Sequence, residues 1–135
     1  MLRRDVEARQ SFLLLGPRQV GKTTLLAELV GDRPGVLGIN LLRARDRDLY
    51  SVDPDRLIDE VGAALKTTRQ RPLIVVVDEL QRVPRLADAV QLILDEHGRN
   101  VVAALSGSSA RKLRRGQVNL LPGRVVRRFL YPLHA

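Results

Sequence analysis

The segment GPRQVGKTT at residues 16–24 carries residue types that bind phosphate. Gly16 and Gly21 can adopt backbone conformations closed to other residues, so the N–H groups between them can turn toward an anion at a helix N-terminus. Lys22 would reach the β- and γ-phosphates of a triphosphate, and the Thr23 hydroxyl would join the ligands of Mg²⁺. The alternative is a chance Gly/Lys match in an ordinary turn between a strand and a helix. The nucleotide-binding residues predicted here are Gly16, Pro17, Arg18, Gln19, Val20, Gly21, Lys22, Thr23 and Thr24.

Two adjacent carboxylates, Asp78 and Glu79, follow the apolar run LIVVV at residues 73–77. A continuous β-branched run is typical of a central parallel strand buried on both faces. Open α/β sheets bind ligands at the carboxyl ends of such strands. We therefore expect Asp78 to hold Mg²⁺, directly or through water, and Glu79 to orient and deprotonate an attacking water. The alternative is that both residues are solvated turn residues that open the next loop.

A third candidate, Ser106, follows the apolar run at residues 101–105. If this strand lies between the strand before the phosphate-binding segment and the strand that ends at Asp78, Ser106 faces the γ-phosphate. Its hydroxyl could then report hydrolysis by hydrogen-bonding phosphate or the attacking water. For Ser108 and Ser109 we expect a different role, as caps of a short helix over residues 108–115.

These side chains need a common scaffold, and the apolar pattern predicts one. Strands are expected at residues 11–15, 36–42, 73–77, 101–105 and 125–130. Helices are expected at residues 1–10, 25–30, 53–65, 86–98 and 108–115. Strands alternating with helices imply right-handed crossovers and a parallel sheet covered on both faces. We expect a three-layer α/β sandwich with five parallel strands in the order 5-1-4-3-2, the arrangement of P-loop nucleotide-binding proteins.

Composition agrees with a single domain over residues 1–135. With 135 residues and 44% hydrophobic residues, the chain can fill one core. Cysteine is absent, which excludes disulfides and Cys-based zinc sites, and His97 and His134 lack ligand spacing. No stretch approaches the ~20 apolar residues of a membrane span, so we expect no membrane partner and a cytoplasmic location.

The net charge of +8 requires an explanation, and many of the basic residues lie late in the chain. They could contact DNA, another polyanion, or the phosphates of a nucleotide held by a neighbouring subunit. Aromatic residues make up only 3% of the chain, which argues against base stacking as the binding mode. The alternative is a solvated basic face. The residues of this basic segment, 111–128, are Arg111, Lys112, Arg114, Arg115, Arg124, Arg127 and Arg128.

Four stretches resemble a known family in this order: GPRQVGKTTLL, IVVVDELQRVPRLADAVQLILDE, LSGSSARKLRRG and LLPGRVVRRFLYPL. The chain is similar to the AAA-type ATPase core of a prokaryotic group whose longer members carry a partly nuclease-like C-terminal region. The resemblance covers essentially the whole chain. It implies ATP and Mg²⁺ as ligands, catalytic roles for Lys22 and Glu79, metal binding by Thr23 and Asp78, and a sensor at Ser106.

The resemblance also suggests Arg124, in Pro122-Gly123-Arg124, as a catalytic arginine that reaches a phosphate across a subunit boundary in a homo-oligomer. The alternative is a structural ion pair with Asp32 or Asp95. The sequence departs from AAA proteins after its fifth strand, where we expect no helical lid and no lid arginine.

Two functions follow. The first is Mg²⁺-dependent ATP binding and hydrolysis, which the retention of both Asp78 and Glu79 favours. The second is a nucleotide- or nucleic-acid-binding module with little hydrolysis, which the basic segment and the expected lack of a lid favour.

Overall fold

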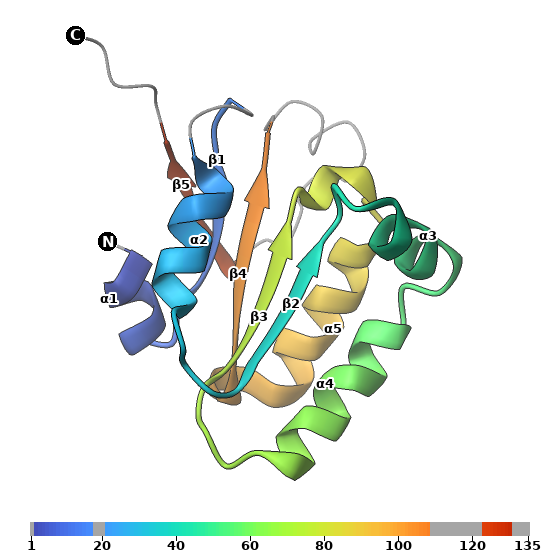
Figure 1. The fold of residues 1–135 in the computed structure, drawn as a ribbon. Helices are drawn as coiled ribbons and strands as arrows, with labels where there is room; N and C mark the ends of the chain where they lie inside the picture. Colours follow the sequence, from blue (N-terminus) through green and yellow to red (C-terminus); the bar gives the residue numbers. More distant parts are fainter. Residues whose placement is uncertain (1, 18–20, 109–122, 131–135) are drawn as a thin grey trace, which may run out of the picture.

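Five parallel strands form the central sheet of the computed structural model, which describes residues 2–17, 21–108 and 123–130 (Figure 1). The strands are β1 (Ser11–Leu15), β2 (Val36–Asn40), β3 (Leu73–Asp78), β4 (Val101–Gly107) and β5 (Val125–Phe129). Their order across the sheet is β2-β3-β4-β1-β5, and every neighbouring pair is parallel. This confirms the predicted order 5-1-4-3-2, in which β4 separates β1 from β3.

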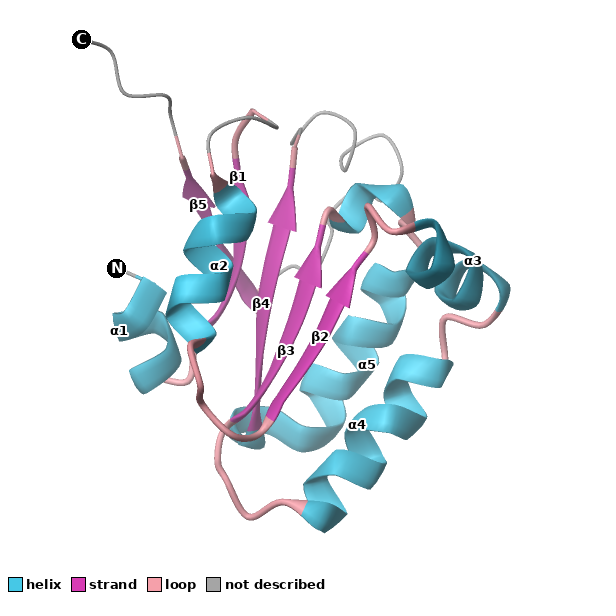
Figure 2. Cartoon of the chain, in the orientation of Figure 1, coloured by secondary structure: helices cyan, strands magenta, loops and turns pink. Residues whose placement is uncertain are grey.

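Helices cover both faces of the sheet and complete three layers (Figure 2). The helices are α1 (Leu2–Glu7), α2 (Lys22–Val30), α3 (Ala44–Val52), α4 (Arg56–Thr67) and α5 (Leu86–His97), with short 3₁₀ turns η1 (Leu80–Arg82) and η2 (Gly98–Asn100). Residues of α1 and α2 pack on one face, and residues of α4 and α5 pack on the other, where Tyr50 of α3 joins them.

Successive residues of β1 alternate between the two cores. Phe12 and Leu14 pack with α1 and α2, whereas Leu13 and Leu15 pack with α4 and α5. All five residues of this strand are buried. Burial on both faces is the physical reason why the central strands β1, β3 and β4 are continuous apolar runs rather than alternating ones.

The structure differs from the predicted elements at several boundaries. Helix α3 was not predicted because ARDRDLYSV lacks apolar periodicity and buries only Tyr50. Strand β4 runs on to Gly107 because its ladder with β1 continues through Ser106 and Gly107. Strand β2 ends at Asn40, earlier than predicted, because the Asn40 side-chain oxygen accepts the N–H of Leu42 in a turn. The predicted helix over 108–115 lies outside the described residues apart from Ser108.

Candidate active site

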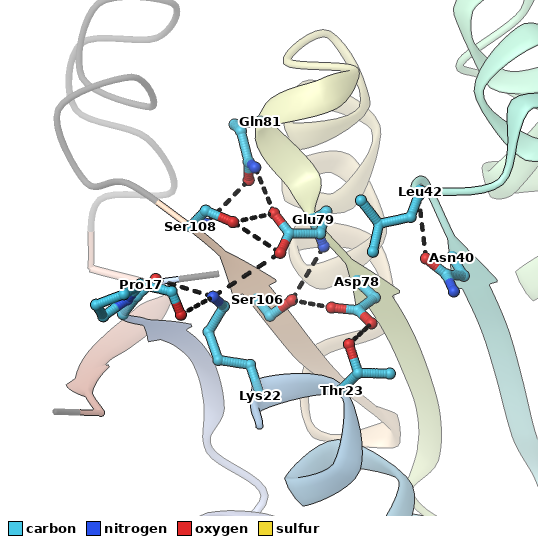
Figure 3. Close-up of polar contacts among 11 residues, drawn as sticks. Pro17, Lys22, Thr23, Asn40, Leu42, Asp78, Glu79, Gln81, Ser106 and Ser108 are labelled. Carbon is cyan, nitrogen blue, oxygen red and sulfur yellow. Dashed lines mark hydrogen bonds and ion pairs between the residues drawn. The ribbon is translucent and has the colours of Figure 1, made fainter. Parts of the chain in front are cut away.

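The predicted chemical groups meet at the carboxyl ends of β1, β3 and β4. The phosphate-binding segment follows β1 and leads into α2, Asp78 ends β3, and Ser106 lies near the end of β4. Figure 3 shows the side chains of Lys22, Thr23, Asp78, Glu79 and Ser106 directed toward one another. The parallel topology thus brings together residues more than 50 positions apart in the chain, as in Thr23 and Asp78, whose separation is 55.

The two glycines of the phosphate-binding segment are required for different reasons. Gly21, which precedes α2, has φ of +81°, a left-handed conformation that favours glycine. Gly16 is not among the residues with positive φ, so a left-handed backbone is not the reason for glycine there. A Cβ at Gly16 would instead lie 2.4 Å from the carbonyl oxygen of Leu130. The reason is that the N–H of Leu130 donates to the carbonyl of Leu15 at 2.7 Å, which brings the two segments together.

Lys22 begins α2, and its side chain is buried, with 2% exposed. Its ammonium donates to the carbonyls of Gly16 at 2.8 Å and Pro17 at 2.9 Å, and it lies 3.8 Å from Oε1 of Glu79. Among the described residues, no side chain caps the N-terminus of α2. A buried cation beside the N-terminus of a helix is a favourable environment for an anionic ligand.

Thr23 and Asp78 are in direct contact. The Thr23 hydroxyl donates to Oδ2 of Asp78 at 2.6 Å, and the Ser106 hydroxyl donates to Oδ1. Hydroxyl and carboxylate oxygens suit Mg²⁺, which commonly takes one or two carboxylates and completes its shell with water and substrate phosphates. Within the described ranges there is no cluster of three or more His, Cys, Asp or Glu residues. The Thr23 and Asp78 oxygens fit a Mg²⁺ whose remaining ligands are water and the phosphates of a nucleotide.

Ser106 is fully buried, and its hydroxyl contacts the two carboxylate residues rather than open space. It donates to Asp78 and accepts the backbone N–H of Glu79 at 3.0 Å. These bonds orient the end of β3 relative to β4. The predicted role of Ser106 as a phosphate sensor stays a prediction.

Glu79 is held in an unusual conformation. Its φ is +62°, which is rare for a residue with a side chain, and only 2% of the residue is exposed. Such a backbone costs about 1 kcal/mol or more and is common at functional sites. Its carboxylate accepts the Ser108 hydroxyl, at 2.7 Å to Oε1 and 2.5 Å to Oε2, and Oε2 also accepts the side-chain amide of Gln81.

Sequence reasoning missed Gln81 entirely and assigned Ser108 to a helix cap, whereas the structure places the Ser108 hydroxyl on Glu79. The signal available in the sequence was position: each residue follows a predicted site residue, Glu79 or Ser106, by two.

Arg124 lies away from this cluster. Val125 is in register with Ser11 at the amino end of β1. Arg124 therefore lies at the amino ends of the strands, whereas Gly16 lies at their carboxyl ends. The five residues of β1 separate these two ends by about 15 Å. The Arg124 side chain pairs with Asp95 of α5, as the structural alternative predicted. This placement puts Arg124 at the other end of β1 from Gly16, and a role at a neighbouring subunit stays a prediction.

The remaining candidates are only partly described. Arg18, Gln19, Val20, Ser109, Arg111, Lys112, Arg114 and Arg115 lie outside the described residues. Thr24 is exposed on the first turn of α2. Within the described part of the basic segment, Arg127 is exposed, whereas Arg128 forms a two-pronged pair with Asp5 at 2.7 Å and 3.1 Å. Arg128 is therefore tied to α1.

A family model described as an AAA domain matches residues 8–135. The chain belongs to the AAA domain family. This confirms the predicted AAA-type P-loop ATPase core, and the family supports nucleotide binding in general terms. No curated protein matches the sequence of this AAA domain. In the described part of the chain, no helix is long and apolar enough to span a bilayer, and the cytoplasmic location stays a prediction.

Solved structures share the fold at low sequence identity. A chain of Drosophila ORC bound to DNA matches with a TM-score of 0.66 and 13% identity over 99% of this chain and 87% of that chain. A DNA polymerase III gamma subunit-related protein from Thermotoga maritima matches at 0.58 and 19% identity, over 96% of this chain and 44% of that one. C. elegans PCH-2 matches with a TM-score of 0.58 and 18% identity, over 98% of this chain and 41% of that chain. The AAA domain thus spans less than half the length of the latter two chains.

Proposed function

We propose that this AAA domain binds ATP with Mg²⁺ and hydrolyses the bond between the β- and γ-phosphates. The observation that carries the proposal is the arrangement of three groups at one edge of the sheet. A buried Lys22 ammonium lies at the phosphate-binding segment, Thr23 contacts Asp78, and the Glu79 carboxylate lies 3.8 Å from Lys22. These are a phosphate-binding cation, a pair of Mg²⁺ ligands and a base within one cluster.

Binding of a triphosphate would replace the contacts that Lys22 makes now. Its ammonium donates to two backbone carbonyls, which are neutral, and phosphate oxygens would be stronger acceptors for it. The backbone N–H groups at the N-terminus of α2 would add further donors. Lys22 would therefore move its hydrogen bonds from Gly16 and Pro17 to the β- and γ-phosphates.

Thr23 and Asp78 are the residues that would hold Mg²⁺, whose chemistry is to neutralise charge on the phosphate oxygens. Glu79 would orient a water and accept its proton. Displacement of Lys22 toward the phosphates would free the Oε1 side of the Glu79 carboxylate for that water.

The second candidate function is a nucleotide-binding module with little hydrolysis. The observation that favours it is that the Glu79 carboxylate already accepts hydrogen bonds from Ser108 and Gln81 and faces Lys22. A base so fully engaged would be slow to take a proton from water.

We further propose DNA or another polyanion as a partner of the basic segment, and a homo-oligomer as the assembled form. The net charge of +8 and the exposed Arg127 support contact with a polyanion. The ion pairs of Arg124 and Arg128 reduce the charge available for it. The Drosophila ORC neighbour is a structure bound to DNA, but its likeness to this chain extends to the fold alone.

Two measurements on the same proteins test the main proposal. Calorimetry with ATP and Mg²⁺ should show binding by the unmodified chain and by Lys66→Ala, an exposed control on α4, and none by Lys22→Ala. Phosphate release, measured with and without DNA, should be about 100-fold slower in Glu79→Gln, which retains ATP binding. Equal ATP affinity of Lys22→Ala and the unmodified chain would refute the phosphate site. Binding without measurable release in any condition would favour the second candidate.

A further inference from the structure

We propose that Gln81 and Ser108 are positioning residues for the Glu79 carboxylate, which they hold by Oε2 so that Oε1 is presented to the phosphate-binding segment. The inference rests on the proposed function, in which Glu79 is the general base. It concerns two residues outside the phosphate-binding segment and the Mg²⁺ ligands, joined to Glu79 through contacts that Figure 3 shows.

The two carboxylate oxygens have different surroundings. Oε2 accepts the Gln81 side-chain amide and lies 2.5 Å from the Ser108 hydroxyl oxygen. Oε1 lies 2.7 Å from the same hydroxyl and 3.8 Å from the Lys22 ammonium. A hydroxyl has a single hydrogen to donate, and Oε2 is the nearer acceptor. Oε2 is thus the anchored oxygen, and Oε1 is the one that faces Lys22 and the phosphate-binding segment.

The two donors also hold each other. The backbone N–H of Ser108 donates to Oε1 of Gln81 at 3.3 Å, so the hydroxyl of Ser108 and the amide of Gln81 approach Glu79 as one unit. They come from different elements, because Gln81 lies in η1 and Ser108 directly follows β4. The Glu79 backbone is fixed as well, since its N–H donates to Ser106 in β4. The backbone of Glu79 is therefore bonded to β4, and its carboxylate is bonded to Ser108, the residue that directly follows β4.

This anchoring matters for the rate because a glutamate side chain has a broad terminal torsion. Without Gln81 and Ser108, the carboxylate could rotate and present either oxygen in many directions. Small errors in the placement of a reacting group cost large factors in rate. Loss of an anchoring hydrogen bond should therefore lower kcat, whereas ATP binding, which relies on Lys22 and the helix N-terminus, should be retained.

A different role for the same contacts is satisfaction of a buried charge, which would support folding without orienting the base. The two roles differ in their effect on kinetics. If the contacts serve folding alone, removing them leaves kcat of the folded protein unchanged. If instead they keep Glu79 from acting as a base, removing them raises kcat. Positioning lowers kcat and leaves KM for ATP unchanged.

The test uses the variants Ser108→Ala and Gln81→Met, which remove one donor each at similar side-chain volume, with Ser108→Thr as the variant that keeps the hydroxyl. Ser51→Ala, an exposed serine on α3, is the matched control. We expect kcat for phosphate release to fall about tenfold in Ser108→Ala and in Gln81→Met. KM for ATP should be unchanged, and Ser108→Thr and Ser51→Ala should behave as the unmodified chain. The Gln81 side-chain amide proton should also shift in the NMR spectrum of Glu79→Ala, since its acceptor is lost.

Each outcome decides the inference. Unchanged or raised kcat in Ser108→Ala and Gln81→Met, with hydrolysis still slowed by Glu79→Gln, would overturn the positioning role and leave the proposed function intact. An unshifted Gln81 amide in Glu79→Ala would overturn the contact itself. No hydrolysis by the unmodified chain would overturn the proposed function, and the positioning role with it.

Discussion

Gly16 shows how a single residue can be required by a distant segment. The chain after β5 returns so close to the phosphate-binding segment that the Leu130 carbonyl occupies the space of a Cβ at position 16. A side chain there would push on backbone rather than on the movable end of a side chain. The position thus couples the geometry of the phosphate-binding segment to the end of the fifth strand.

We expect Gly16→Ala to lower the free energy of unfolding by about 1–3 kcal/mol, the usual cost of forcing extra volume into a filled space. Gly38→Ala is the matched control, because a Cβ on Gly38 of β2 meets nothing within 4 Å and its φ is ordinary. Urea unfolding of the two variants provides the comparison. Equal stability of both would show that the Leu130 contact yields without cost.

At the scale of elements, a buried tyrosine of α3 is bonded to α4. The Tyr50 hydroxyl donates to Oε1 of Glu60 at 2.5 Å, and Glu60 also lies 3.9 Å from Arg56. Burial raises the pKa of the Tyr50 hydroxyl, and the hydrogen bond and negative charge of Glu60 raise it further. The folded state therefore holds this proton more tightly than the unfolded chain does.

This linkage has a definite sign. The contribution of the Tyr50 proton to stability is fully present below pH 10, the ordinary tyrosine pKa, and it is lost as the pH rises above that value. We expect the free energy of unfolding of the unmodified chain to fall more steeply above pH 10 than that of Tyr50→Phe. Denaturant unfolding of both proteins from pH 8 to 11 measures the difference, in which other titrating groups cancel. Parallel curves over this range would contradict the linkage.

At the scale of the whole molecule, the carboxyl ends and the amino ends of the strands carry different charged residues. The carboxyl edge carries Lys22, Asp78 and Glu79, whereas Arg124 lies at the amino edge and pairs with Asp95. Catalysis by Arg124 would therefore need a second chain whose carboxyl edge meets this amino edge. An arginine that reaches a transferring phosphoryl group from another subunit contributes about 10³ or more in rate where such residues are known.

The prediction that Arg124 serves a neighbouring subunit can be tested by mixing. Glu79→Gln chains keep Arg124 but lack the base, and Arg124→Ala chains keep the base. Mixed assemblies should recover part of the phosphate release that each protein lacks alone. The control is Arg99→Ala, at another exposed arginine near the amino ends of the strands. This variant should release phosphate as the unmodified chain does, without mixing. Activity of the mixture no higher than the sum of its parts would leave the Asp95 pair as the role of Arg124.

The amino-acid sequence alone determined the alternation of strands and helices and the place of Lys22, Thr23, Asp78 and Glu79 at the carboxyl ends of the strands. These features are local: a strand buried on both faces is a continuous apolar run, and glycines mark the turn into α2. The sheet order is not local, and its prediction rested on the resemblance to P-loop nucleotide-binding proteins. Helix α3 was not predicted, because it buries a single residue and its sequence therefore shows no apolar periodicity.

Only the tertiary structure decided the contacts between segments far apart in the chain. Ser108 and Glu79 are 29 positions apart, and neither residue type nor local spacing distinguishes this bond from a helix cap. The close approach of Leu130 to Gly16 and the pair of Arg124 with Asp95 are likewise invisible to local pattern. The physical reason is that periodicity reports which face of an element is buried, whereas the partner of a polar side chain depends on where other elements end in space.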